Sequence, residues 1–180
     1  KGIYDSLKLN LKLIPMESEI NRDTLFAQKR TDGSILSPIE AFMQQEQGIP
    51  AVPTFTNEGL YYIVASNDST FTKPEQLREK SLSVTRKSAY NYFADKVLDE
   101  LEITQDDINK PELSRESLRM QMLENGQIDA AVLRDPYVSK ALQKGCKVLL
   151  SSSSYPITLS VTAFSDSILN TKENDIKKLI

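Results

Sequence analysis

The chain has 180 residues, of which 39% are hydrophobic and 26% charged, and its formal net charge is −3. This composition is ordinary for a globular protein and excludes wholesale disorder. The length suffices for one domain, or for two small lobes that share one ligand. No apolar run approaches the roughly 18 residues that span a bilayer. Lys and Arg are scattered, which argues against a nucleic-acid binder.

Two absences exclude further classes of site. The chain has no histidine, which excludes His-based acid–base catalysis and His-ligated metal sites. Cys146 is the single cysteine, so neither an internal disulfide nor a cysteine-cluster metal site is possible. We therefore expect no metal, no cofactor and no enzymatic activity of these kinds.

Both ends of the sequence look cut. The chain opens at Lys1 with neither Met nor a signal peptide, and a helical pattern over 174–180 stops without a C-cap. We expect this sequence to be part of a longer protein, with the N-terminal part of its fold and any targeting segment upstream.

The hydrophobic periodicity predicts strands that alternate with helices. In chain order we expect a strand at 8–14, a helix at 21–29, a strand at 34–36, a helix at 38–47, a strand at 60–65, a short helix from 72, a strand at 81–85, a helix at 90–101, a helix at 116–125, a strand at 128–133, a helix at 136–144, and strands at 148–150 and 157–164. This order predicts an α/β fold of mostly parallel sheets with helices on both faces.

One internal repeat organises this pattern. Asp32 and Asp129 each precede a short apolar strand, a helix that begins at proline, and a glycine sixteen residues after the aspartate. The pattern fits two generic β-α-β units, and it also fits two equivalent lobes. In two equivalent lobes, the strand-to-helix loops 36–38 and 134–136 would face each other across a cleft, because ligands of α/β proteins bind at such loops.

The sequence resembles a known family at several motifs. They lie at 32–38, 48–50, 61–64, 77–85, 88–92, 119–133 and 135–137. Together they resemble the type II periplasmic solute-binding proteins of ABC importers, in the branch that handles nitrate, sulfonates, taurine and thiamine-precursor pyrimidines. The resemblance implies a two-lobed fold whose chain crosses twice between lobes. We expect the first lobe to comprise 1–70 and 153–180, and the inserted second lobe 71–152, with hinges at the polar stretches 66–70 and 151–154.

Candidate ligand residues lie where strands lead into helices or loops. Each also has a purely structural explanation: a serine or aspartate before a helix is an N-cap, and a polar loop residue belongs to a turn. Ser88 begins an amphipathic helix, and the N–H groups of its first turn favour an anion. Tyr90 fits the apolar stripe of that helix, which leaves Tyr92 to meet a ligand. The candidates are Ser34, Ser37, Thr54 and Thr56 in the first lobe and Ser88, Ala89, Tyr92, Arg134, Asp135 and Tyr137 in the second.

Three functions are compatible with the resemblance. The first is an extracytoplasmic receptor, periplasmic or lipid-anchored through an upstream cysteine, that passes a small solute to an ABC permease. The second is the ligand-sensing effector domain of a transcriptional regulator. The third is a pyrimidine-forming enzyme, which the absence of histidine argues against. The ligand is either an oxyanion, such as a sulfonate, or a neutral pyrimidine-like heterocycle. For an anion, Arg86, Lys87 or Arg134 would supply charge.

Overall fold

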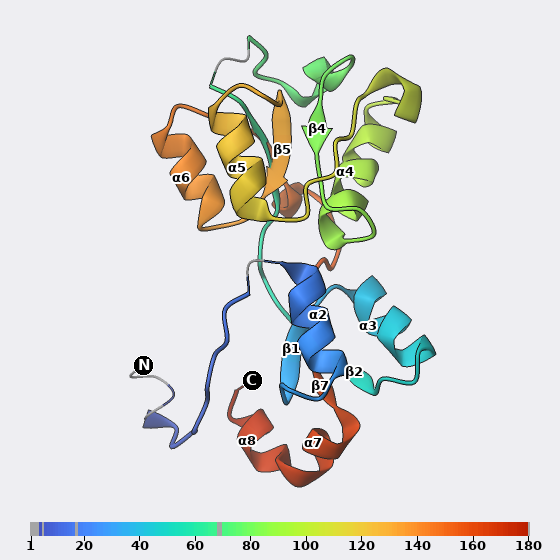
Figure 1. Cartoon of the computed structure of the whole chain (residues 1–180), viewed down its shortest axis with the longest axis vertical. Coiled ribbons are helices and arrows are strands. Elements are labelled where there is room, and N and C mark those ends of the chain that lie inside the picture. The colour runs from blue at the N-terminus through green and yellow to red at the C-terminus, as the bar shows by residue number, and fades with distance from the viewer. Residues whose placement is uncertain (1–3, 5, 17, 68–69, 180) are drawn as a thin grey trace. The chain divides into compact units, whose positions relative to one another are not determined.

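The chain folds into two compact units. The computed structural model describes residues 4, 6–16, 18–67 and 70–179. Unit 1 comprises Lys1–Asn57 and Ser160–Ile180, and unit 2 comprises Glu58–Leu159 (Figure 1). The chain thus leaves unit 1 after residue 57 and returns after residue 159, whereas the sequence placed these passages at 70 and 153. Both passages lie closer to the ends of the sequence than predicted, because the strand at 62–65 and the serine run at 152–154 belong to unit 2.

Unit 1 contains a three-stranded sheet with the order β1-β7-β2. Its core packs the sheet against α2 and α3 through Phe26, Leu36, Ala41, Ala51, Val161 and Ala163. In chain order its elements are α2 (Glu19–Ala27), β1 (Gly33–Leu36), α3 (Pro38–Glu46), β2 (Ala51–Thr56), β7 (Val161–Ser165), α7 (Asp166–Thr171) and α8 (Glu173–Lys177).

Unit 2 contains a four-stranded sheet with the order β4-β5-β3-β6. Helix α4 packs on one face, and α5 and α6 pack on the other (Figure 1). Its helices and strands are β3 (Tyr62–Ala65), β4 (Leu82–Ser83), α4 (Ala89–Glu100), α5 (Glu116–Glu124), β5 (Ala130–Leu133), α6 (Tyr137–Gln143) and β6 (Lys147–Ser151), with 3-10 turns at Pro74–Leu77, Gln105–Asp107 and Ser152–Ser154. Helices on both faces are confirmed for this unit.

The prediction of mostly parallel sheets is wrong. Among the described strands, only β4 and β5 form a parallel ladder, and all other strand pairs are antiparallel. The reason lies in the two repeats, β1-α3-β2 and β5-α6-β6. In each repeat the two outer strands run parallel to each other, but an antiparallel strand lies between them. That central strand is β7 in unit 1 and β3 in unit 2, so each unit receives its middle strand from the chain that has just left the other unit.

The strand predicted at 8–14 is absent. Residues 9–16 have no regular secondary structure in the described part of the chain, and Leu13 and Ile14 are 69% and 45% exposed. Alternating leucines favour a strand only where a neighbouring strand accepts the backbone hydrogen bonds, and no described strand pairs with this segment. Helix α2 starts at Glu19 after Ser18, earlier than the predicted start at residue 21.

The predicted hinges lie inside unit 2. Ser152 accepts a hydrogen bond from the backbone N–H of Tyr61 (3.0 Å) and donates its own N–H to the Tyr61 carbonyl (2.8 Å). The serine run is therefore tied to the start of β3. Two residues of the other predicted hinge, 68 and 69, lie outside the described residues.

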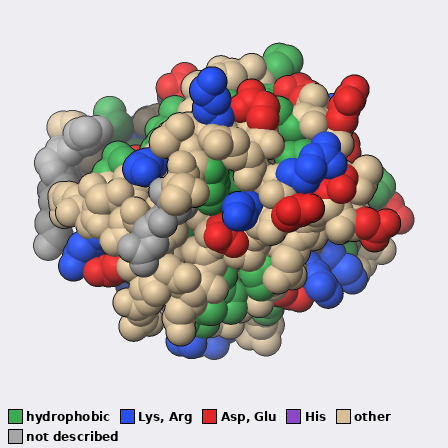
Figure 2. Space-filling model, turned by 90° about the horizontal axis from the view of Figure 1, so that it is seen from above, with side chains coloured by type: hydrophobic (Ala, Val, Ile, Leu, Met, Phe, Trp, Pro, Cys, Tyr) green, Lys and Arg blue, Asp and Glu red, His purple; other side chains and the backbone are tan. Residues whose placement is uncertain are grey.

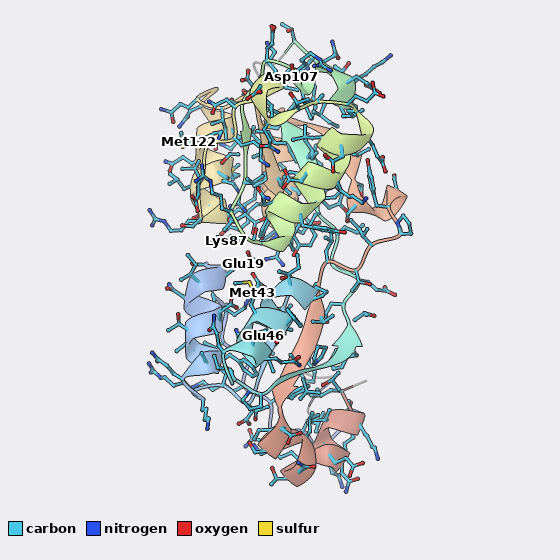
Figure 3. The ribbon with its side chains drawn as sticks, turned by 90° about the vertical axis from the view of Figure 1, so that its right-hand side faces the viewer. Glu19, Met43, Glu46, Lys87, Asp107 and Met122 are labelled. Atoms are coloured by element: carbon cyan, nitrogen blue, oxygen red, sulfur yellow. The ribbon has the colours of Figure 1, made fainter. Side chains whose placement is uncertain are left out.

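Helix α3 carries an exposed apolar stripe. Ile39, Phe42 and Met43 are 43%, 62% and 41% exposed, whereas Glu40 and Gln44 are buried. Met43 and Glu46 are labelled along this helix in Figure 3. The core of unit 1 thus takes only Ala41 from the apolar residues of α3.

Candidate functional site

Helix α4 begins at a serine cap, as predicted. Ser88 donates its hydroxyl to the Thr85 carbonyl (2.5 Å) and accepts a hydrogen bond from the Asn91 N–H (3.5 Å). Ser88 and Ala89 are both nearly buried, at 4% and 1% exposure. The first-turn N–H groups of a helix have no acceptor within the helix, and they carry its partial positive charge. Tyr92 is 40% exposed while Tyr90 is buried, which confirms that the two tyrosines lie on different faces.

A hydrogen-bonded chain joins the start of α4 to the end of β5. Arg134 donates its Nε–H to the hydroxyl oxygen of Tyr90 (2.6 Å), and Tyr90 donates its hydroxyl to Oε2 of Glu116 (2.7 Å). Oε1 of Glu116 accepts the backbone N–H of Arg134. Arginine has no acceptor, so the Tyr90 proton must point to Glu116. Both carboxylate oxygens therefore accept hydrogen bonds, and the side chain and backbone of Arg134 are fixed together.

Aromatic rings complete this arrangement. The rings of Tyr61 and Tyr90 meet edge to face, with centroids 4.9 Å apart. The guanidinium carbon of Arg134 lies 5.2 Å from the centroid of Tyr61 and 5.1 Å from that of Tyr90. Cation–π contacts at such distances favour the charged guanidinium and hold its plane.

A second arginine lies deeper in the same cluster. Arg119 is fully buried, and its guanidinium carbon lies 4.4 Å from the Tyr90 centroid. Its Nε donates to the Val132 carbonyl (3.1 Å), and its Nη1 donates to Oγ1 of Thr85 (2.6 Å) and to the Leu113 carbonyl (2.5 Å). Arg119 therefore ties α5 to β5 and to the segment that leads into α4.

The polar cluster of unit 2, defined as Tyr61, Thr85, Tyr90, Glu116, Arg119 and Arg134, has a positive balance. It holds two guanidinium groups and one carboxylate, a formal charge of +1. Of the other predicted cations, Arg86 has a side chain that is 68% exposed and pairs with Glu112 at 3.4 Å. Exposed pairs of this kind contribute little energy. Figure 3 shows Lys87 at the opposite end of unit 2 from Asp107.

The end of unit 2 marked by Asp107 has its own local electrostatics. Backbone and hydroxyl hydrogen bonds from Thr104, with a smaller contribution from Arg78, lower the pKa of Asp107.

On the face that Figure 2 shows, acidic and basic side chains are intermixed, so that face presents no field of a single sign.

The loop after Arg134 is engaged within its own unit. Asp135 accepts hydrogen bonds at Oδ1 from the Ser139 N–H (3.2 Å) and hydroxyl (2.6 Å), so its carboxylate serves the first turn of α6. Tyr137 is partly buried against the core between the sheet and α5 and α6, and Lys140 Nζ lies 5.2 Å from its ring centroid. Both residues have structural partners, and a ligand role for either stays a prediction.

In unit 1, Ser37 forms a capping box at the start of α3. Its hydroxyl accepts the Glu40 N–H (3.1 Å), and Oε2 of Glu40 accepts the Ser37 N–H (2.7 Å). The same oxygen accepts a hydrogen bond from Arg22 (2.9 Å), which also pairs with Asp23 and Glu19. Burial disfavours the charged guanidinium, but the three carboxylates outweigh this effect and raise the pKa of Arg22. Burial raises the pKa of Asp23.

The other candidates of unit 1 are arranged along its strands. Ser34 lies in β1 opposite Ala163, and Thr54 donates its hydroxyl to the Val52 carbonyl (3.1 Å). Thr56 is exposed at the end of β2. Ser34, Ser37, Thr54 and Thr56 thus belong to unit 1, and the six other predicted ligand residues belong to unit 2.

Glu116 and Arg119 are not among the predicted ligand residues. Both are buried together with Leu123 on α5. The signal was present, because positions 116, 119 and 123 share one helix face, and two charged residues on an otherwise inward face require partners. Among the described residues no group of acidic or sulfur-bearing side chains is placed to hold a metal ion.

Comparison with known proteins identifies the family. The model of the NMT1/THI5-like family matches residues 1–178. The chain belongs to this family. None of the curated proteins compared with the chain matches it. Within the described part of this NMT1/THI5-like chain, no helix is long and apolar enough to cross a membrane.

Solved structures share the fold of this NMT1/THI5-like chain. The alkanesulfonate-binding protein SsuA from Xanthomonas axonopodis pv. citri, bound to MOPS, superposes with a TM-score of 0.79 at 14% identity, over 98% of this chain and 63% of that one. The aliphatic sulphonate binding protein SsuA from Escherichia coli gives 0.75 at 16%, over 98% and 61%. A ligand-binding component of an ABC-type import system from Staphylococcus aureus gives 0.81 at 13%, over 95% and 60%.

These superpositions confirm the predicted α/β fold of periplasmic binding proteins. The chain spans about 60% of the length of these three structures. At these sequence identities the similarity establishes the fold only. The solutes named for the neighbouring structures are not thereby assigned to this chain.

Proposed function

We propose that the protein is an extracytoplasmic solute-binding receptor, which captures a small molecule and delivers it to an ABC permease. The observation that carries this proposal is the family match over residues 1–178. It is supported by neighbours described as a periplasmic sulphonate binding protein and as a ligand-binding component of an ABC-type import system. The proposed location is the periplasm or, through a lipid anchor on an upstream cysteine, the outer face of the cell membrane.

Receptor function is favoured over the two alternatives. The three neighbours reported above are described as binding proteins, one of them as a component of an ABC-type import system, and none of the three is described as a regulator or an enzyme. The chain also lacks histidine, on which the related pyrimidine-forming enzymes rely. We infer that it binds its solute without chemical change and uses no cofactor.

Native mass spectrometry of the full-length protein tests the proposal directly. A receptor purified under gentle conditions is expected to carry a small molecule that dissociates on collisional activation. Calorimetry with the released compound should then give reversible one-to-one binding. Conversion of the compound into a product during incubation would contradict the receptor function and favour an enzyme.

The gene neighbourhood separates receptor from regulator. A receptor is expected beside genes for a membrane permease and an ATPase, whereas an effector domain is expected in one reading frame with a DNA-binding segment. A helix-turn-helix segment in the full-length reading frame would overturn the proposal.

The lobed resemblance also predicts motion. If the two units act as the lobes of a receptor, the bending segments are the chain passages near residues 57–58 and 159–160, not the predicted hinges. Small-angle scattering of the full-length protein should show a smaller radius of gyration with saturating solute. An unchanged radius would contradict closure.

A further inference from the structure

Arg134 differs from the other cations near the start of α4 in how firmly it is held. Its side chain is 29% exposed, against 68% for Arg86. Its Nε–H is used by Tyr90, two aromatic rings flank its guanidinium, and its backbone N–H is bonded to Glu116. A guanidinium that is already fixed loses little side-chain entropy when an anion arrives, and its planar fork matches acidic groups.

The surroundings of Arg134 favour an anion. The carboxylate of Glu116 lies 3.9 Å from Nη2 of Arg134, and its two oxygens are already engaged by Tyr90 and by the backbone of Arg134. Glu116 therefore orients Arg134, while the buried charge of Arg119 leaves the cluster with one positive charge more than it has negative. Tyr90 is the second residue of α4, so the positive end of that helix adjoins the same cluster.

We propose that Arg134 binds the acidic group of the solute, a sulfonate, phosphonate or carboxylate, and that Tyr90 and Glu116 are positioning residues for it. This inference rests on the proposed receptor function. It selects the anionic class over the neutral pyrimidine class, and it selects Arg134 over Arg86 and Lys87. The partly exposed guanidinium receives the anion, and the Nε–H bond to Tyr90 is kept.

The test is calorimetry of the full chain with four probes: methanesulfonate, methylphosphonate, acetate and a neutral hydroxymethylpyrimidine. At least one acidic probe is expected to bind the parent more tightly than the pyrimidine does. Arg134→Gln should weaken that binding at least tenfold, and Arg134→Lys should restore part of it. Arg115→Gln, which makes the same change at an exposed position of unit 2, should leave the affinity within twofold.

The positioning roles of Tyr90 and Glu116 require a measurement that a loss of stability alone would not change. Tyr90→Phe removes only the hydroxyl, and Glu116→Gln keeps the shape but removes the charge. Both variants should weaken the acidic probe about three- to tenfold, as an order of magnitude for one misplaced charged hydrogen bond. Their neutral-probe affinity should not change. Circular dichroism and thermal unfolding confirm that each variant is folded at the temperature of the titration.

The outcomes separate the inference from the receptor function. If the parent binds only the neutral pyrimidine, or if Arg134→Gln binds the acidic probe as tightly as the parent, the assignment of Arg134 is wrong and the receptor function stands. If no probe binds and native mass spectrometry finds no co-purified small molecule, the receptor function fails and the inference fails with it.

Discussion

Replacement of Arg119 by methionine is expected to destabilise the protein by about 3–5 kcal/mol. The side chain is fully buried and donates three hydrogen bonds, to Val132, Thr85 and Leu113. A hydrogen bond with a charged partner contributes about 1.5–3 kcal/mol net. The sum is partly offset because the variant no longer has to remove a guanidinium from water. Methionine is unbranched but ends short of the guanidinium position, so the variant also loses the contact with the Tyr90 ring.

Urea unfolding followed by far-UV circular dichroism measures this change. The matched control is Arg115→Met at the N-cap of the same helix, where the side chain is exposed and makes no capping hydrogen bond, so the change should stay within about 0.5 kcal/mol. Arg119→Lys keeps the charge but cannot reach three acceptors as a fork, so it should lie between the parent and Arg119→Met. A stability of Arg119→Met within 1 kcal/mol of the parent, on the order of experimental scatter, would refute the view that this network stabilises unit 2.

Two further predictions concern packing and titration. Gly33→Ala should lower the free energy of unfolding in urea by about 1–3 kcal/mol, because the new Cβ would lie 2.6 Å from the ring of Phe164. The control is Gly59→Ala, where the new Cβ would have no atom within 4 Å. Equal stability of the two variants would contradict the steric argument. Burial, and then Glu100, raise the pKa of Tyr155 from its ordinary value of 10.0 to about 12. The neutral phenol therefore contributes stability below pH 10 that is lost as the pH rises toward 12. An ultraviolet titration of the parent compared with Tyr155→Phe should give this phenol a midpoint of about 12. Glu100→Gln should lower that midpoint, and a midpoint near 10 in the parent would contradict the prediction.

Local sequence determined where helices α3 and α4 begin. The spacing of Ser37, Pro38 and Glu40 specifies a capping box, because its two hydrogen bonds join groups only three residues apart. The N-cap role of Ser88, directly before the apolar stripe of α4, could be predicted for the same reason. The side chains that share one helix face follow from a period of 3.6, which separated buried Tyr90 from exposed Tyr92.

Tertiary structure alone decided which strands are neighbours. The apolar run of β3 reads the same whether its partners are parallel or antiparallel, and the run of leucines at 7–13 reads as a strand although no described strand pairs with it. The cluster around Arg134 is equally nonlocal. Arg134 forms hydrogen bonds with Tyr90, 44 residues away in the sequence, and with Glu116, 18 residues away. Helical periodicity can indicate that each of these residues lies on a buried face, but it cannot predict that they contact one another. Pairings of this kind depend on which surfaces the folded chain brings together, because a charged or polar side chain enters the interior only where a distant partner compensates its lost hydration.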